Sequence, residues 1–143
     1  MYKSVYLKRG KEDSLKRFHP WIFSGAINSM DENIEDGEIV RVFTNDNAFI
    51  ATGFFQIGSI AVRVLSFSDI EINDEFWYRR LSAAYSMRKA LGIINEDYNT
   101  TFRLFHGEGD YIPGLIVDCY GDTAVMQAHN VGIHVFRHDI CKA

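Results

Sequence analysis

The stretch EIVRVFTNDNAFIATGFFQIGSIAVRVLSF, residues 38–67, decides the fold of the first half of the chain. It holds three runs rich in β-branched and aromatic residues, at 38–44, 49–56 and 60–67, with polar or glycine-containing turns between them. Residues of these types favour strands, whereas Asn, Asp, Gly and Ser favour tight turns. The pattern therefore predicts three successive strands joined by short connections.

Two further strands are expected upstream, at 2–8, where the side chains alternate, and at 26–30. Residues 12–18 favour a brief helical turn, which Pro20 prevents from continuing because the residue before a proline prefers extended geometry. Short strands at close spacing predict a small antiparallel barrel or curled sheet, which we place at residues 1–72.

The pattern changes to a helix after this predicted barrel. An apolar stripe at helical spacing runs from Trp77 to Leu91, Asp74 and Glu75 precede it, and Gly92 offers a stop. Acidic residues favour helix N-termini, and glycine favours the position after a helix. These features predict a helix of about 17 residues that connects two domains. Residues 73–99 are assigned to this linker helix and its loop.

Residues 100–143 are expected to form an incomplete α/β unit. Strand patterns at 101–106, 114–119 and 123–129 predict a meander, and apolar residues at helical spacing from Val131 onward predict one final helix. A strand-strand-strand-helix unit that stops on its helix looks unfinished. The predicted fold class is thus mixed α+β, in which a small β-barrel is followed by a linker helix and this unit.

The composition excludes several classes of protein. With 143 residues, 47% of them hydrophobic, the chain can build one domain or two small ones and is not expected to be disordered as a whole. It has no apolar run that suits a membrane span or a secretory signal, so a cytoplasmic location is expected. Cys119 and Cys141 lack the paired spacing of a zinc site or dithiol motif, so ordinary thiols and no metal are expected.

Positive charge is concentrated at the N-terminal end, although the whole chain carries a net charge of -4. Residues 1–27 hold six cations and two anions, and the rest of the chain holds nine cations and seventeen anions. A local patch of this kind can attract a polyanion, because charges farther away than roughly 8 Å are largely screened at physiological ionic strength.

The run KRFHPWIFSGAI, residues 16–27, joins this charge to large rings and turn-forming residues. No helical or strand period continues through it, so a shaped loop is expected. Cations beside an aromatic platform are typical of proteins that bind single-stranded or looped RNA. The rings could equally be buried in the core, and the two roles can coexist. The expected RNA-binding residues are Lys8, Arg9, Lys11, Lys16, Arg17, His19 and Trp21.

A second polar cluster, His106, Glu108 and Asp110, alternates along a predicted strand end. Side chains placed in this way could converge as paired acids or metal ligands. The surrounding glycines and Pro113 instead favour a turn-rich hairpin whose carboxylates are solvated or bind local amides. No phosphate-binding, dinucleotide-binding or nucleophile-elbow motif occurs. No catalytic, cofactor-binding or metal-binding residue is therefore assigned.

Two segments, LKRGKEDSLKRFHPWIFSGAI at 7–27 and RLFHGEGDYIPGLIVDCYGDTAVMQ at 103–127, resemble the front part of the ribosomal RNA large-subunit methyltransferase I family. The resemblance covers nearly all of the chain. It implies an N-terminal PUA domain that binds RNA and a truncated central α/β domain. It also implies an S-adenosylmethionine-dependent transferase that methylates carbon 5 of a cytosine in 23S rRNA. Structured rRNA is the implied partner, with no role for a membrane.

The family's S-adenosylmethionine site and catalytic cysteine lie in a C-terminal methyltransferase domain, and no matching motif occurs in this chain. Cys119 and Cys141 therefore do not inherit the nucleophile role, and the chain alone is expected to be catalytically inactive. The resemblance implies an N-terminal fragment of a longer rRNA-processing enzyme, whose full-length form could be a homodimer.

Three functional hypotheses remain open from the sequence. The first is an RNA-binding and substrate-positioning region of a 23S rRNA cytosine-5 methyltransferase. The second is a protein-interaction or dimerisation module without RNA affinity of its own, in which the aromatic loop or the Trp77 helix packs against another subunit. The third is a small independent enzyme that uses His106, Glu108 and Asp110.

Overall fold

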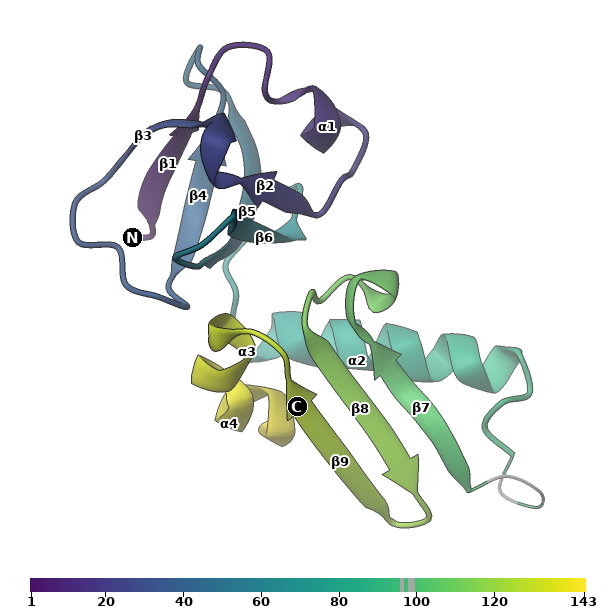
Figure 1. The fold of residues 1–143 in the computed structure, drawn as a ribbon. Helices are drawn as coiled ribbons and strands as arrows, with labels where there is room; N and C mark the ends of the chain where they lie inside the picture. The colour runs from purple at the N-terminus through teal and green to yellow at the C-terminus, as the bar shows by residue number, and fades with distance from the viewer. Residues whose placement is uncertain (96, 98–99) are drawn as a thin grey trace. The chain divides into compact units, whose positions relative to one another are not determined.

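The computed structural model describes residues 1–95, 97 and 100–143, which divide into two units, Met1–Ile70 and Glu71–Ala143 (Figure 1). Strands dominate the first unit, whereas the second combines a sheet with helices. None of the helices in the described residues has the length and apolar character that a membrane crossing requires.

The first unit is built on one six-stranded sheet, whose strands follow the order β2-β6-β5-β4-β1-β3. Two short helical turns interrupt the strands along the chain. In chain order the elements are β1 (Lys3–Leu7), α1 (Asp13–Lys16), β2 (Trp21–Phe23), η1 (Ser24–Ala26), β3 (Ile27–Met30), β4 (Ile39–Phe43), β5 (Phe49–Phe55) and β6 (Ile60–Ser66).

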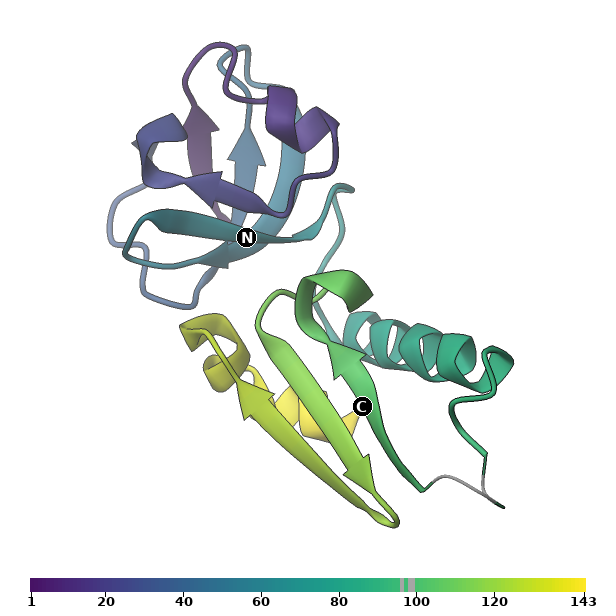
Figure 2. The same ribbon diagram turned by 45° about the vertical axis from the view of Figure 1, so that its right-hand side comes forward.

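This sheet is curled, as its short strands and tight turns predict (Figure 1, Figure 2). β4, β5 and β6 are the successive antiparallel strands expected from residues 38–67. The purely antiparallel arrangement is wrong for β1, which runs parallel to β4 with Lys3 opposite Val40, and antiparallel to β3. The N-terminal strand is therefore inserted inside the sheet. Local alternation cannot reveal such a pairing, because it joins segments far apart in sequence.

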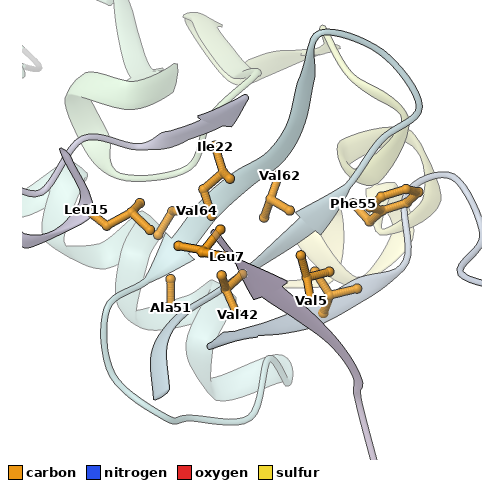
Figure 3. Close-up of a cluster of buried hydrophobic side chains, with 10 residues drawn as sticks. Val5, Leu7, Leu15, Ile22, Val42, Ala51, Phe55, Val62 and Val64 are labelled. Carbon is orange, nitrogen blue, oxygen red and sulfur yellow. The ribbon is translucent and has the colours of Figure 1, made fainter. Parts of the chain in front are cut away.

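Apolar side chains from several strands fill the inside of the curl (Figure 3). Val5 and Leu7 of β1 meet Val42 of β4 and Val62 of β6, and none of these four side chains is exposed. Leu15 of α1, which is 2% exposed, joins the same cluster. Full burial of one side chain of this size contributes about 1.5–3 kcal/mol. The core therefore fixes both the strands and the short helix that follows β1.

Residues 16–27 are more regular than the predicted shaped loop. Residues 21–23 form β2, which pairs antiparallel with β6 and places Ile22 opposite Val62. The next three residues form η1, a single 3-10 turn. A strand of three residues is too short for alternation to stand out in the sequence.

The second unit contains the predicted antiparallel meander, in the order β7-β8-β9. The prediction of a single final helix is wrong, because the chain instead forms two short helices. Phe136 lies between them and packs against Trp77, with 5.7 Å between the ring centroids. The elements are α2 (Asp74–Ala90), β7 (Thr101–His106), η2 (Gly107–Asp110), β8 (Leu115–Tyr120), β9 (Thr123–Ala128), α3 (Val131–Val135) and α4 (Arg137–Lys142).

The predicted helix is confirmed as α2, which has 17 residues. Asn73 caps its start by accepting a hydrogen bond from the Phe76 N–H at 3.0 Å. α2 lies along β7 (Figure 2) and also contacts α4, whose Lys142 Nζ is 2.6 Å from Asp74 Oδ2. α2 therefore packs within the second unit, and its role as a linker between domains stays a prediction. The end of the assigned linker loop, at residues 96, 98 and 99, lies outside the described residues.

Candidate nucleic-acid interface

Three buried apolar side chains hold the segment that carries the predicted RNA-binding residues against the sheet of the first unit. Leu7 of β1, Leu15 of α1 and Ile22 of β2 are each 3% exposed or less and share one core cluster. Side chains alternate along a strand, so the burial of Ile22 turns Trp21 and Phe23 toward the opposite face. Phe23 is 51% exposed, and Trp21 is half-buried. Of these two rings, that of Phe23 is therefore at the surface and that of Trp21 is partly covered.

A cavity of about 350 Å³ lies beside β2, and we call it the β2 cavity. Residues from the loop after β1, from α1, from β2 and from η1 line it, among them Lys11, Ser14, Trp21, Phe23 and Gly25. A β-carbon added to Gly25 would meet no atom within 4 Å. The lining therefore combines aromatic and aliphatic residues with a serine and a lysine, and it has open space at the glycine.

Lys8 ties the loop after β1 to η1. Its backbone N–H donates to the Ala26 carbonyl at 2.8 Å, and its Nζ donates to the Gly25 carbonyl at 2.9 Å. A lysine ammonium has three donors, so two remain for an external acceptor. Because Gly25 lines the β2 cavity, Lys8 holds a positive charge next to that cavity.

The other predicted cations differ in how their charge is balanced. Lys16 lies 3.8 Å from Glu12 Oε1 and 4.0 Å from Asp13 Oδ1, so two carboxylates partly neutralise it. The remaining three are exposed and form no salt bridge with any residue that the structure describes: Arg9, Lys11 and Arg17. The geometry therefore favours these three over Lys16 as phosphate ligands.

His19 is exposed and is oriented by the strand that follows it. Its Nδ1 lies 3.2 Å from both the N–H and the carbonyl oxygen of Trp21, and the two ring centroids are 6.0 Å apart at 79°. The Phe23 ring lies 6.4 Å from the same imidazole. Since Nδ1 is used within the protein, Nε2 is the nitrogen left to meet an RNA group.

All seven predicted residues lie between the end of β1 and β2, in one part of the first unit. The sequence prediction left out Phe23 and Gly25. The alternation around Ile22 could have indicated Phe23, whereas no local pattern marks a glycine that lines a cavity. The role of the seven residues in RNA binding stays a prediction.

The second polar cluster is held by internal contacts. The Arg88 guanidinium donates from Nη1 to Asp110 Oδ1 at 3.0 Å and from Nη2 to Oδ2 at 2.7 Å. Asp110 Oδ2 also accepts the His106 backbone N–H at 2.7 Å. His106 and Glu108 are exposed, and the His106 Nδ1 lies 3.3 Å from the Arg103 guanidinium. Asp110 is thus a buried structural anchor, which argues against a catalytic dyad here.

The electrostatics of this cluster agree with that role. Burial acts to raise the pKa of Asp110, but the hydrogen bonds from the Arg88 guanidinium and the His106 backbone N–H, together with the positive charge of Arg88, lower it below its ordinary value. Asp110 therefore stays ionised at neutral pH, whereas a general acid needs a raised pKa. Within the described part of the chain, no group of three or more His, Cys, Asp or Glu residues is placed to hold a metal ion.

Cys119 lacks the environment of an activated nucleophile. Cys119 is half-buried, Cys141 is exposed, and both are free thiols. Burial and the neighbouring Asp118 carboxylate raise the pKa of Cys119, whereas reactive cysteines have a lowered pKa.

The comparison with known proteins matches a family to the first of the two structural units. Residues 5–67 match the PUA-like domain family, within the first unit. The whole chain is 39% identical to the ribosomal RNA large subunit methyltransferase I of Aeromonas hydrophila subsp. hydrophila and 36% identical to that of Vibrio campbellii. The chain spans 36% of each of these relatives, or about a third of their length.

The fold has a counterpart among solved structures. A Streptococcus mutans protein assigned to the SAM-dependent methyltransferases superposes with a TM-score of 0.81 over 99% of this chain and 36% of its own, at 21% identity. At that identity the match shows a shared fold of both units. The chain is therefore similar over its whole length to the ribosomal RNA large subunit methyltransferase I proteins, and its residues 5–67 match the PUA-like domain family.

Proposed function

We propose that this chain binds structured rRNA and positions it as substrate for a longer S-adenosylmethionine-dependent 23S rRNA cytosine-5 methyltransferase. One observation carries the proposal. The PUA-like unit presents exposed cations without salt-bridge partners among the described residues, and one of them, Lys11, lines the same cavity as the exposed Phe23 and the half-buried Trp21. Cations provide affinity for phosphates, and rings provide surfaces on which unpaired bases stack.

The charge of this surface suits a polyanion, although the whole chain has a net negative charge. Arg9, Lys11 and Arg17 follow one another on the loop and helix between β1 and β2, and Lys8 adds a tethered ammonium. At physiological ionic strength, screening limits the influence of distant acidic residues to about 8 Å. The local excess of positive charge therefore governs what binds at this surface.

S-adenosylmethionine is proposed as the cofactor of the full-length protein, but the described residues do not fit as its site. Nucleotide-type cofactors bind at the carboxyl ends of parallel strands in doubly wound sheets, whereas the sheet of the second unit is an antiparallel meander. A cavity of about 740 Å³ in that unit is lined mostly by apolar side chains and by no acidic side chain. No carboxylate side chain there could hold the cofactor's ribose hydroxyls or its amino group.

The test of RNA binding compares Arg17→Ala with the unchanged protein on a fragment of large-subunit rRNA at several salt concentrations. Loss of one phosphate contact should lower the slope of log affinity against log salt by roughly 0.7–0.9. Arg79→Ala is the matched control, because Arg79 is a well-exposed arginine on α2 in the other unit. An unchanged slope and affinity for Arg17→Ala would remove Arg17 from the interface. Salt-independent binding by the unchanged protein, or none, would reject the RNA-binding role.

The protein-interaction hypothesis keeps one observation in its favour. Tyr78 and Tyr85 of α2 are 56% and 40% exposed and line the 740 Å³ cavity with Leu104 and Met126. Trp77 itself is 1% exposed, so a partner would meet these tyrosines and not Trp77. Sedimentation velocity over a range of protein concentrations tests this idea, since self-association makes the apparent mass depend on concentration.

A further inference from the structure

We propose that the β2 cavity receives a single unstacked base of the bound RNA. This inference rests on the proposed RNA-binding function and adds to it how the RNA is held. Cations alone would bind any strand through its phosphates, but a cavity of defined size selects a nucleotide that is not paired. Loops, bulges and strand ends would then be preferred over duplex RNA.

The size and composition of the cavity suit this occupant. Its volume of about 350 Å³ lies near the lower end of the roughly 300–1,000 Å³ typical of small-ligand pockets. Trp21 and Phe23 line it together with the apolar Leu15 and Ile22, and Ser14 and Lys11 add residues that can form hydrogen bonds. A base needs both kinds of surface, because its faces are apolar and its edges carry donors and acceptors.

The alternation of β2 presents the two rings as a pair. Trp21 and Phe23 are two residues apart on a strand, and Ile22 between them is 3% exposed. The fold therefore orients both rings away from the core at no cost to the apolar cluster. A phenylalanine that is 51% exposed loses contact with water when a base stacks on it, which makes stacking favourable.

The surrounding charges can hold the phosphates of the same nucleotide outside the cavity. Lys11 lines the cavity, and Lys8 is fixed 2.9 Å from the carbonyl of Gly25, another lining residue. An apolar peptide would gain nothing from two ammonium groups at this place. Charge complementarity therefore favours an anionic nucleotide over an apolar side chain.

Gly25 gives a way to close the cavity without disturbing the core. It has no left-handed backbone conformation, and a β-carbon at this position meets no atom within 4 Å. A side chain at position 25 can therefore begin in open space. Gly25→Leu adds an apolar side chain to the lining of the cavity, and Phe23→Ala removes an aromatic ring from it.

The experiment uses RNA hairpins that carry sequences of large-subunit rRNA. The hairpin that binds the protein most tightly is then remade as a series, in which one loop base at a time is removed to leave an abasic site. One abasic position should weaken binding about 5- to 150-fold, the range expected for one stacked base. Gly25→Leu and Phe23→Ala should each weaken binding of the intact hairpin within the same range. Both should bind the abasic hairpin as the unchanged protein does, and the salt slope should stay the same because no phosphate contact is lost.

Tyr120→Ala is the matched control, since Tyr120 is an aromatic residue on β8 with a similar exposure of 53%. Circular dichroism spectra that match the unchanged protein show that each variant is folded. Three results would each overturn the base pocket if binding stays salt-sensitive: no abasic position weakens it, neither cavity variant weakens it, or Tyr120→Ala weakens it as much as the cavity variants do. Each of them would leave the RNA-binding function standing. Failure of the unchanged protein to bind any hairpin would instead reject the function on which the pocket rests.

Discussion

Arg88 and Asp110 join α2 to the turn after β7 through two parallel hydrogen bonds, and their side chains are only 10% and 6% exposed. This bidentate geometry is the strongest form of ion pair that a protein makes between side chains. Because both groups have left water, each depends on the other to remain charged inside the second unit.

Removal of one member of this pair should destabilise the second unit strongly. We expect Arg88→Ala to lower the free energy of unfolding by about 3 kcal/mol, since it leaves the Asp110 carboxylate buried without its partner. Arg79→Ala breaks an exposed ion pair with Glu75 on the same helix and should cost about 0–1 kcal/mol. Urea unfolding, followed by the fluorescence of the buried Trp77 in a Trp21→Phe background, measures both. Equal costs for the two variants would contradict the role of the buried pair.

The same pair should make the second unit sensitive to acid. The pKa of Asp110 is lower in the folded state than its ordinary value of 3.8, so folding favours the ionised carboxylate. Its stabilising contribution is therefore complete above that ordinary value and is lost as the pH falls through the lower folded-state pKa. Asp110→Asn should flatten this acid dependence, measured by the same fluorescence signal at decreasing pH. Asp118→Asn, which alters a more exposed pair with Arg103, should flatten it less; the reverse order would contradict the assignment.

Gly53 of β5 faces the backbone of β6 so closely that a β-carbon there would clash with the Arg63 carbonyl. Because the obstacle is backbone, no side-chain rotation can relieve it. Gly53→Ala should therefore destabilise the first unit by about 1–3 kcal/mol or prevent its folding. Gly25→Ala adds the same methyl group in open space and should leave stability almost unchanged. Urea unfolding followed by Trp21 fluorescence in a Trp77→Phe background compares them, and similar midpoints would count against the clash.

Lys16 and Lys11 should contribute unequally to RNA binding although they are the same residue type on one short segment. Lys16 already interacts with Glu12 and Asp13, whereas Lys11 has no salt bridge with a described residue. Lys11→Ala should lower the salt slope by roughly 0.7, as expected for one single-strand phosphate contact, and Lys16→Ala should lower it less. Filter binding on the same rRNA fragment measures both slopes. A larger change for Lys16 would mean that RNA displaces its carboxylate partners.

Much of the local structure could be predicted from sequence, because strands and helices leave periodic patterns. The strands at 39–43, 49–55 and 60–66 and the 17-residue helix from Asp74 follow directly from apolar spacing and from the residues at their ends. The parallel insertion of β1 could not be predicted, since it depends on pairing between Lys3–Leu7 and Ile39–Phe43. Apolar alternation shows which face of a strand is buried but not which strand lies beside it.

The candidate site was predictable in part for the same reason. The cations and Trp21 are visible as residue types, but their pairing with carboxylates, as at Lys16, requires coordinates. Arg88 shares the apolar stripe of α2 and looks like an ordinary surface residue on it, because a long apolar stem can lie on such a stripe while its head reaches solvent. Here the head turns inward to Asp110, a partner 22 residues away along the chain.

The position of β1 between β3 and β4 also bears on how the polypeptide is made. Residues 3–7 are synthesised before their neighbour at 39–43, so β1 leaves the ribosome ahead of its parallel partner. During that interval Val5 and Leu7, which are fully buried at the end, have no sheet to enter. Until β4 emerges, β1 therefore stays an unpaired strand whose two apolar side chains lack their core, a natural target for chaperones that act during translation.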